Sequence, residues 1–139
     1  MDTQSVGGSC LCGAAAYEIT PPYLFFQYCY CSRCRKNSGS VHAANLLLDS
    51  GQFKWLHGEE KVKLYRMPDV RGFSTAFCTE CGSAMPWQTK NGKYYLVPSG
   101  GLNADPGAKP DRNIYWASRA SWYVPENELP CFEEVPNPG

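Results

Sequence analysis

The positions of the eight cysteines constrain this sequence more than any other feature. Seven of them fall into three short motifs: Cys10 and Cys12, then Cys29, Cys31 and Cys34, then Cys78 and Cys81. The eighth, Cys131, stands alone. Small buried side chains and disulfides are the competing interpretations, but chance rarely clusters cysteines in this way, and a C-x-C pair closes a strained disulfide ring. The spacing therefore favours metal binding.

Two of the motifs together supply the ligands of one closed zinc site. Tetrahedral zinc accepts four thiolates at about 2.3 Å, and a metal with four protein ligands is structural. A C-x-x-C turn delivers two thiolates to one ion, and a C-x-C segment does so from alternate positions of an extended chain. A glycine, Gly13 or Gly82, follows the second cysteine of each pair and permits a turn with positive φ. We expect Cys10, Cys12, Cys78 and Cys81 to bind this zinc.

The triplet offers three thiolates within six residues and lacks an obvious fourth partner. Three protein ligands and one exchangeable position are typical of catalytic zinc. We expect Cys29, Cys31 and Cys34 to hold a second zinc ion of this kind. Alternatively, Cys131, His42 or His57 completes the ligand set and makes both sites structural.

The charge of the three-thiolate site predicts its preferred ligand. Three thiolates and one Zn²⁺ carry one net negative charge, so this zinc is a weaker Lewis acid than one bound by neutral histidines. A soft thiolate suits such an ion better than hydroxide does. A substrate thiolate adds a further negative charge, which Arg33, Arg35 and Lys36 are placed to balance. The alternative is that these three residues form an ordinary solvated basic turn.

The rest of the chain predicts one mainly β domain over residues 1–139. Short β-branched and aromatic runs alternate with turn signals, and helical periodicity is absent. Asn91-Gly92 is a hairpin signal, and we expect extended coil over the surface from Tyr123 onward. The predicted strands are Ala14–Ile19, Phe25–Cys29, His42–Leu48, Lys61–Tyr65, Gly72–Phe77, Ala84–Gln88, Lys93–Val97 and Asn113–Trp116.

Composition excludes several classes of function. The 13 basic and 13 acidic side chains balance, which argues against a nucleic-acid partner. No apolar run approaches the roughly 20 residues of a membrane helix. The segment from Met1 to Ser5 lacks the features of a signal peptide. We therefore expect a cytoplasmic protein, in which clustered cysteines stay reduced.

Three cysteine motifs in this order resemble those of the glutathione-dependent formaldehyde-activating enzyme family, which also includes centromere protein V. The resemblance covers nearly the whole chain. It rests on residues 8–13 (GSCLCG), 29–36 (CYCSRCRK) and 77–82 (FCTECG), and on the endings at residues 112–114 (RNI), 121–123 (SWY), 129–130 (LP) and 132–133 (FE). Two stretches depart from the common pattern: residues 41–45 (VHAAN) and 100–103 (GGLN).

The resemblance implies a small Mss4-like (β-tent) zinc-binding fold, a structural zinc at the first and last motifs and a catalytic zinc at the triplet. It also implies a carbon–sulfur lyase of the S-(hydroxymethyl)glutathione synthase type, with a small thiol such as glutathione as partner. We expect Arg33, Arg35, His42 and Asn45 to line the thiol cleft. The alternative function is a non-catalytic, zinc-stabilised binding module of the same fold.

Overall fold

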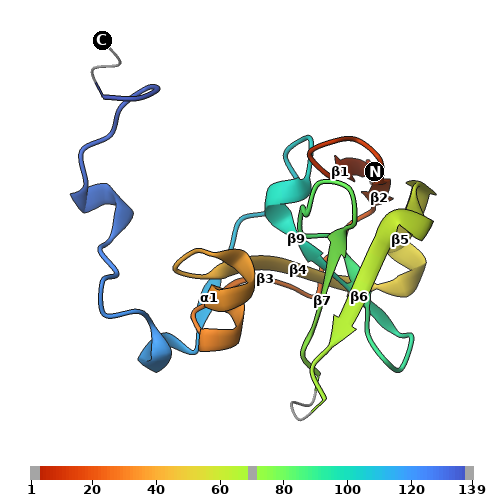
Figure 1. Ribbon diagram of the computed structural model, residues 1–139, viewed down its shortest axis with the longest axis horizontal. Coiled ribbons are helices and arrows are strands. Elements are labelled where there is room, and N and C mark those ends of the chain that lie inside the picture. The colour runs from red at the N-terminus through yellow and green to blue at the C-terminus, as the bar shows by residue number, and fades with distance from the viewer. Residues whose placement is uncertain (1–3, 69–71, 137–139) are drawn as a thin grey trace.

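Five strands form the main sheet of the computed structural model, which describes residues 4–68 and 72–136. Their order is β10 (Arg112–Ile114), β3 (Phe25–Cys29), β4 (Ala43–Asp49), β9 (Tyr94–Pro98) and β8 (Trp87–Gln88). The strands pair antiparallel, except that β10 lies parallel to β3. The central strands cross the middle of the molecule in Figure 1. This sheet carries the residues on which the site is built.

Two smaller sheets pack beside the main one. The first has the order β1 (Val6–Ser9), β2 (Ala16–Ile19) and β5 (Phe53–His57). The second is the ribbon of β6 (Val62–Arg66) and β7 (Ser74–Cys78), drawn in light green in Figure 1. Both sheets are antiparallel. The mainly β fold of short strands expected from the sequence is confirmed.

Helical structure in the described residues is limited to short segments. The single α-helix there, α1, spans Ser32–Ser38. Five 3₁₀ turns lie at Ser50–Gln52, Glu59–Lys61, Ser99–Gly101, Trp116–Ser118 and Glu126–Glu128. In the part of the chain that the structure describes, no helix is long and apolar enough to span a membrane.

The hydrophobic core lies where the main sheet meets the β1–β2–β5 sheet. Alternating residues of β2 are buried, so that Tyr17 and Ile19 point inward. Tyr17 stacks on Phe53 with ring centroids 5.5 Å apart. Leu46 and Val97 of adjacent strands are fully buried in the same cluster. Two of the cysteines, Cys10 and Cys78, belong to this core, which gives their site a structural setting.

Each of the eight predicted strands has a counterpart, with boundaries that differ by a few residues. The Asn91-Gly92 turn is also present: it joins β8 to β9, and Gly92 has a φ of 76°. The strands β1 and β5 and the helix α1 were missed. Glycines in β1 and polar residues in β5 weaken the local strand signal, and pairing with β2 on both sides supplies the stability that propensity does not.

The carboxyl-terminal segment is irregular, as expected, apart from its 3₁₀ turn at Glu126–Glu128. It does not lie over the surface, however. Every described residue from 126 to 136 is exposed, and Figure 1 shows this segment in dark blue running away from the body. The expectation that it runs over the surface was therefore wrong from residue 126 onward, whereas Tyr123 packs against Tyr30 with ring centroids 5.8 Å apart.

Candidate metal centres and the adjoining cleft

Four cysteines from distant parts of the chain meet beside the core. Cys10 and Cys12 lie in the loop between β1 and β2, whereas Cys78 ends β7 and Cys81 lies in the turn that follows. Their four sulfur atoms all lie within 4.8 Å of one another. We call this group the four-cysteine cluster. This cluster links the β1–β2 hairpin, called the amino-terminal hairpin below, to the β6–β7 ribbon.

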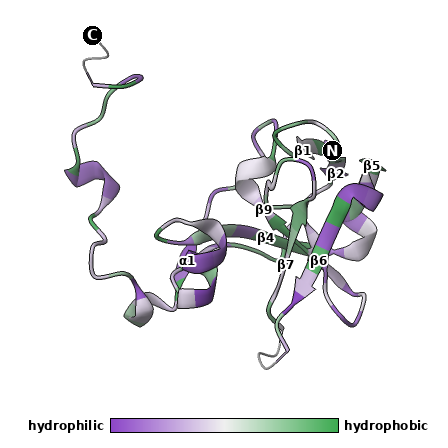
Figure 2. Cartoon of the chain, in the orientation of Figure 1, coloured by the Kyte–Doolittle hydropathy of each residue, from purple (hydrophilic) through white to green (hydrophobic). Residues whose placement is uncertain are grey.

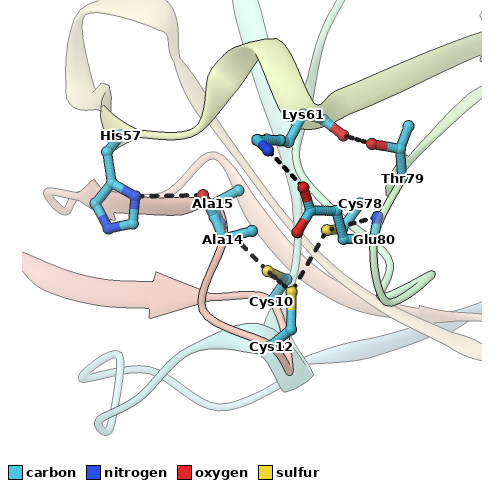
Figure 3. Close-up of polar contacts among 9 residues, drawn as sticks. All are labelled: Cys10, Cys12, Ala14, Ala15, His57, Lys61, Cys78, Thr79 and Glu80. Atoms are coloured by element: carbon cyan, nitrogen blue, oxygen red, sulfur yellow. Dashed lines mark hydrogen bonds and ion pairs between the residues drawn. The ribbon is translucent and has the colours of Figure 1, made fainter.

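The geometry of this cluster fits a tetrahedral metal ion. The Sγ atoms of Cys10 and Cys12 are 3.7 Å apart, and those of Cys12 and Cys78 are 3.9 Å apart (Figure 3). Zinc–sulfur bonds of about 2.3 Å imply edges of about 3.8 Å in a tetrahedron. A disulfide requires about 2.05 Å, and all eight cysteines are free. The sulfur atoms are therefore spaced for a shared ion and not for a covalent bond.

Local backbone structure holds these sulfurs in place. The N–H of Gly13 donates to the carbonyl of Cys10 at 3.1 Å, and the N–H of Gly82 donates to that of Cys78 at 2.8 Å. Both glycines have a φ of 79°, as the sequence predicts for turns beneath a metal. Ala15 donates its N–H to the sulfur of Cys10 at 3.3 Å. Such donors stabilise the thiolate form.

The Cys81 thiol shows the same stabilisation in its pKa. The hydroxyl of Ser83 lies 3.2 Å from its sulfur. Hydrogen bonds from this hydroxyl and from the backbone N–H groups of Ser83 and Cys12 lower the pKa of Cys81 to about 5. This sulfur is therefore prepared to act as an anionic ligand.

The second group, the three-cysteine cluster, is built around the start of α1. Cys29 ends β3, Cys31 is the N-cap of the helix, and Cys34 lies in its first turn. The N–H of Cys34 donates to the sulfur of Cys31 at 3.4 Å, and Gly39 ends the helix in the left-handed conformation. The three sulfurs lie within 4.8 Å of one another. The end of β3, the N-cap and the first turn of α1 thus bring the three cysteines of the C-x-C-x-x-C motif together.

Electrostatics in this cluster also favours a cation. Burial and the adjacent sulfurs of Cys29 and Cys31 raise the pKa of Cys34. Burial also acts to raise the pKa of Cys31, but hydrogen bonds to its sulfur and the Arg33 guanidinium outweigh it and lower that pKa. Three thiolates this close repel one another. The cluster therefore fits a divalent metal ion, which would let all three sulfurs ionise.

A cleft of about 420 Å³ opens beside the three-cysteine cluster. Cys29 and Cys34 are among its lining residues, and Cys31 is not. Residues of β3, β4 and β9 in the main sheet also line it. Its described lining contains no lysine, arginine, aspartate or glutamate and includes Gln27, Asn37, Ser38, Ala43, Asn45, Phe73, Met85, Trp87 and Ile114. The described lining is therefore mostly apolar, with a few uncharged polar side chains among it.

The residues expected at the cleft divide into two groups. His42 and Asn45 line it, together with Gly100 from the second departing stretch. The His42 ring is stacked on Tyr28, with centroids 4.1 Å apart. Arg33 and Arg35 lie on α1 and are not among the lining residues.

The basic residues of α1 are Arg33, Arg35 and Lys36, and none of them is among the lining residues of the cleft. The Arg33 guanidinium lies 5.5 Å from the centroid of the Phe73 ring. The Nε atoms of Arg33 and Arg35 are buried and meet no hydrogen-bond partner among the described residues. Most of the α1 ribbon is hydrophilic in Figure 2.

The suggested fourth ligands of the triplet do not join it in the described residues. The Nδ1 atom of His57 lies 3.3 Å from the carbonyl oxygen of Ala14, near the other cluster (Figure 3). Cys131 is exposed on the carboxyl-terminal segment. His42 lines the cleft but lies outside the group of close ligand atoms.

Sequence reasoning missed several polar residues of the cleft, of which Gln27 is one of the two that are buried. It is 8% exposed and lies two residues before Cys29 on the same face of β3. A signal was present in the sequence. A polar residue at an inward position of an otherwise aromatic strand predicts a buried hydrogen bond.

Comparisons with known proteins agree with this architecture. The model of the family described as glutathione-dependent formaldehyde-activating enzyme matches residues 5–118. A curated protein from Halomonas elongata, named for the same activity, is 36% identical over 84 residues, which cover 56% of this chain and 52% of that protein. The match thus spans about half the length of the curated relative. A crystal structure of a Rhodobacter sphaeroides protein has a TM-score of 0.57 and 25% identity, over 75% of this chain and 97% of that one.

Proposed function

We propose, since the chain belongs to the glutathione-dependent formaldehyde-activating enzyme family, that it is a zinc-dependent carbon–sulfur lyase. Its substrates would be a small thiol such as glutathione and an aldehyde, of which formaldehyde is the first candidate. The observation that carries this proposal is that Cys29 and Cys34 line the cleft. A metal ion held by the three-cysteine cluster would therefore border a space of about 420 Å³, which can admit a small substrate.

The two clusters would divide the work between them. The four-cysteine cluster would close the coordination sphere of a bound metal ion, and its members Cys10 and Cys78 belong to the core, so its role would be structural. The three-cysteine cluster offers one ligand fewer and borders the cleft, so its role would be catalytic. Zinc bound there would hold the substrate sulfur as a thiolate.

In the reaction, the substrate sulfur forms a bond to the carbonyl carbon of the aldehyde. The π electrons of the carbonyl move to its oxygen, which receives the proton that the thiol loses. The product is a hydroxymethyl thioether, and cleavage is the reverse of these steps. The chain must therefore tolerate an added negative charge at sulfur and stabilise the developing charge on oxygen.

The residues around the three-cysteine cluster suit the requirement for an added negative charge at the substrate sulfur. Arg33 lowers the pKa of Cys31, which places its positive charge within electrostatic reach of the cluster. The buried Nε atoms of Arg33 and Arg35 retain unused donors among the described residues. Because these cations lie outside the cleft lining, they would balance the charge of a bound thiolate without occupying the space of the aldehyde.

Purified without chelators, the protein should carry close to two zinc ions per chain. The basis is the division of seven cysteines into groups of four and three. Elemental analysis against protein concentration measures this ratio directly. One ion per chain, with every cysteine reduced, would remove the basis for an open catalytic site.

Cobalt substitution tests the preference for thiols. Thiolate-to-cobalt charge-transfer bands report each bound sulfur, so adding glutathione should increase their intensity as a further sulfur binds at the three-cysteine cluster. Serine at the same concentration, which offers a hydroxyl in place of the thiol, is the control and should leave the spectrum unchanged. A spectrum that no small thiol alters would contradict the proposal and favour the non-catalytic binding module.

A further inference from the structure

Gln27 is a buried polar residue that lines the cleft. It is 8% exposed and lies on β3. Because side chains alternate along a strand, Gln27 and Cys29 share one face, and both line the cleft. Burying a carboxamide is costly unless its donors and acceptor find partners. The hydrogen bonds of this residue therefore indicate what it does.

Arg112 fixes the orientation of the Gln27 carboxamide. The parallel pairing of β10 with β3 places the two residues opposite each other. The Nε atom of Arg112 donates to Oε1 of Gln27 at 2.7 Å, and its guanidinium lies 5.1 Å from the centroid of the Phe25 ring. Arginine has donors only, so the atom that it meets must be the carboxamide oxygen. The amide nitrogen is thereby turned to the other side.

The amide nitrogen of Gln27 has no acceptor among the described residues, and the residue lines the cleft. Among the described residues, the side chain makes one hydrogen bond, the one from Arg112. The paired residue on the neighbouring strand, Asn45, also lines the cleft. A donor whose oxygen already accepts from a cation is polarised, and its N–H groups become stronger donors.

We propose that Nε2 of Gln27 donates a hydrogen bond to the aldehyde oxygen, and that Arg112 is its positioning residue. The inference rests on the proposed function and assigns the group that stabilises the developing charge on the aldehyde oxygen. When the carbon–sulfur bond forms, the carbonyl π electrons move to oxygen, and the N–H of Gln27 stabilises that charge until the proton arrives. When the bond breaks, the same N–H stabilises the oxygen as it loses its proton.

A neutral donor has an advantage at this position. A lysine or arginine in the cleft would form ion pairs with the nearby thiolates and with the substrate sulfur. The Gln27 carboxamide instead conveys part of the Arg112 charge to the oxygen while remaining neutral itself. Different groups would thus stabilise the two substrate atoms: Gln27 the carbonyl oxygen, and a metal held by the cysteines the thiolate sulfur.

Two variants remove the donor in different ways. Gln27→Glu keeps an oxygen that accepts from Arg112, and Gln27→Met removes both polar atoms at similar length. With formaldehyde and glutathione, kcat should fall about 10²-fold in both, the usual effect of losing one donor to a developing oxyanion. For Gln27→Met, the glutathione concentration at which the cobalt spectrum saturates should stay within about threefold of the value for the parent protein. Gln4→Glu, at an exposed position outside the cleft, is the charge-matched control and should behave as the parent.

The positioning role of Arg112 is tested by conservative rescue. Arg112→Met should lower kcat about tenfold, and Arg112→Lys, which retains a cationic donor, should restore most of it. The side-chain amide signals of Gln27, identified by their absence from the Gln27→Glu spectrum, give a readout independent of turnover. These ¹H–¹⁵N signals should move when glutathione and formaldehyde are added together to the zinc-loaded protein, and stay in place with glutathione alone.

The outcomes separate this inference from the proposed function. If glutathione alters the cobalt spectrum but Gln27→Met keeps more than a third of the parent kcat, the role of Gln27 is overturned and the thiol chemistry stands. Amide signals unmoved by the mixture, in a parent protein that turns over, overturn it as well. If neither thiol binding nor turnover is found in the parent, the inference falls together with the proposed function.

Discussion

Replacing Cys78 with serine should destabilise the protein more than any other single cysteine substitution. Cys78 is fully buried, belongs to the main core and shares its cluster with Cys10 and Cys12. Its loss removes one of four metal ligands and loosens the link between the amino-terminal hairpin and the β6–β7 ribbon. Metal binding free energy is folding free energy, so we expect a loss on the order of 5 kcal/mol and a Tm lower by roughly 15 °C.

The matched substitution in the other cluster should behave differently. Cys31 belongs to a small satellite group with Cys29 and Cys34, packed against three partly buried hydrophobic residues and separate from the main core. We expect Cys31→Ser to lose the second metal ion and to keep a Tm within a few degrees of the parent. Thermal unfolding and zinc content measured on both variants decide the matter. Equal losses of stability would contradict the division into structural and catalytic clusters.

Cys131→Ser controls for the general effect of removing a thiol. Cys131 is exposed on the carboxyl-terminal segment and lies outside both clusters. This variant should match the parent in Tm and in zinc content. A large effect here would mean that Cys131 has a structural role that its position in the fold does not indicate.

Replacing Gly58 with alanine should destabilise the protein strongly, although no buried side chain is removed. Gly58 has a φ of 80°, in the left-handed region that favours glycine. A Cβ atom there would overlap the Ala14 carbonyl and would lie 2.6 Å from the Cα of Ala15. Those contacts are backbone atoms of the first cysteine loop, which cannot move without disturbing the metal ligands. We expect a loss of about 3 kcal/mol in the free energy of unfolding, measured by denaturant titration.

Gly107 isolates the cost of the backbone conformation. Its φ is 83°, and nothing lies within 4 Å of a Cβ built on it. Gly107→Ala should therefore cost only about 1 kcal/mol. The additional loss in the free energy of unfolding of Gly58→Ala, compared with Gly107→Ala, therefore measures the cost of the steric overlap alone. Equal stability of the two variants would contradict the close approach of Gly58 to the loop that carries Cys10 and Cys12. Faster zinc release to a chelator from Gly58→Ala would show that the overlap reaches the metal site.

The strand pattern followed from the sequence because it is local. Runs such as Phe25–Cys29 and Lys93–Val97 alternate or concentrate β-forming residues between turn signals, and the structure contains both at nearly those positions. Helix α1 was missed because it has no apolar face. It forms because the Cys31 sulfur caps its first turn and Gly39 accepts the left-handed conformation at its end.

The cysteine spacing by itself determined three local motifs, because ligands two or three residues apart reach a common point through a single turn of backbone. Only the tertiary structure brings the first and last motifs together, with the sulfurs of Cys12 and Cys78 meeting at 3.9 Å across 66 positions of sequence. The cleft and the hydrogen bond that orients Gln27 were likewise decided by tertiary structure. Gln27 and Arg112 are 85 residues apart and meet because β10 returns to lie parallel to β3. Such a return is set by the packing of the whole domain, since no local pattern in the three residues of β10 specifies which strand they will join or in which direction.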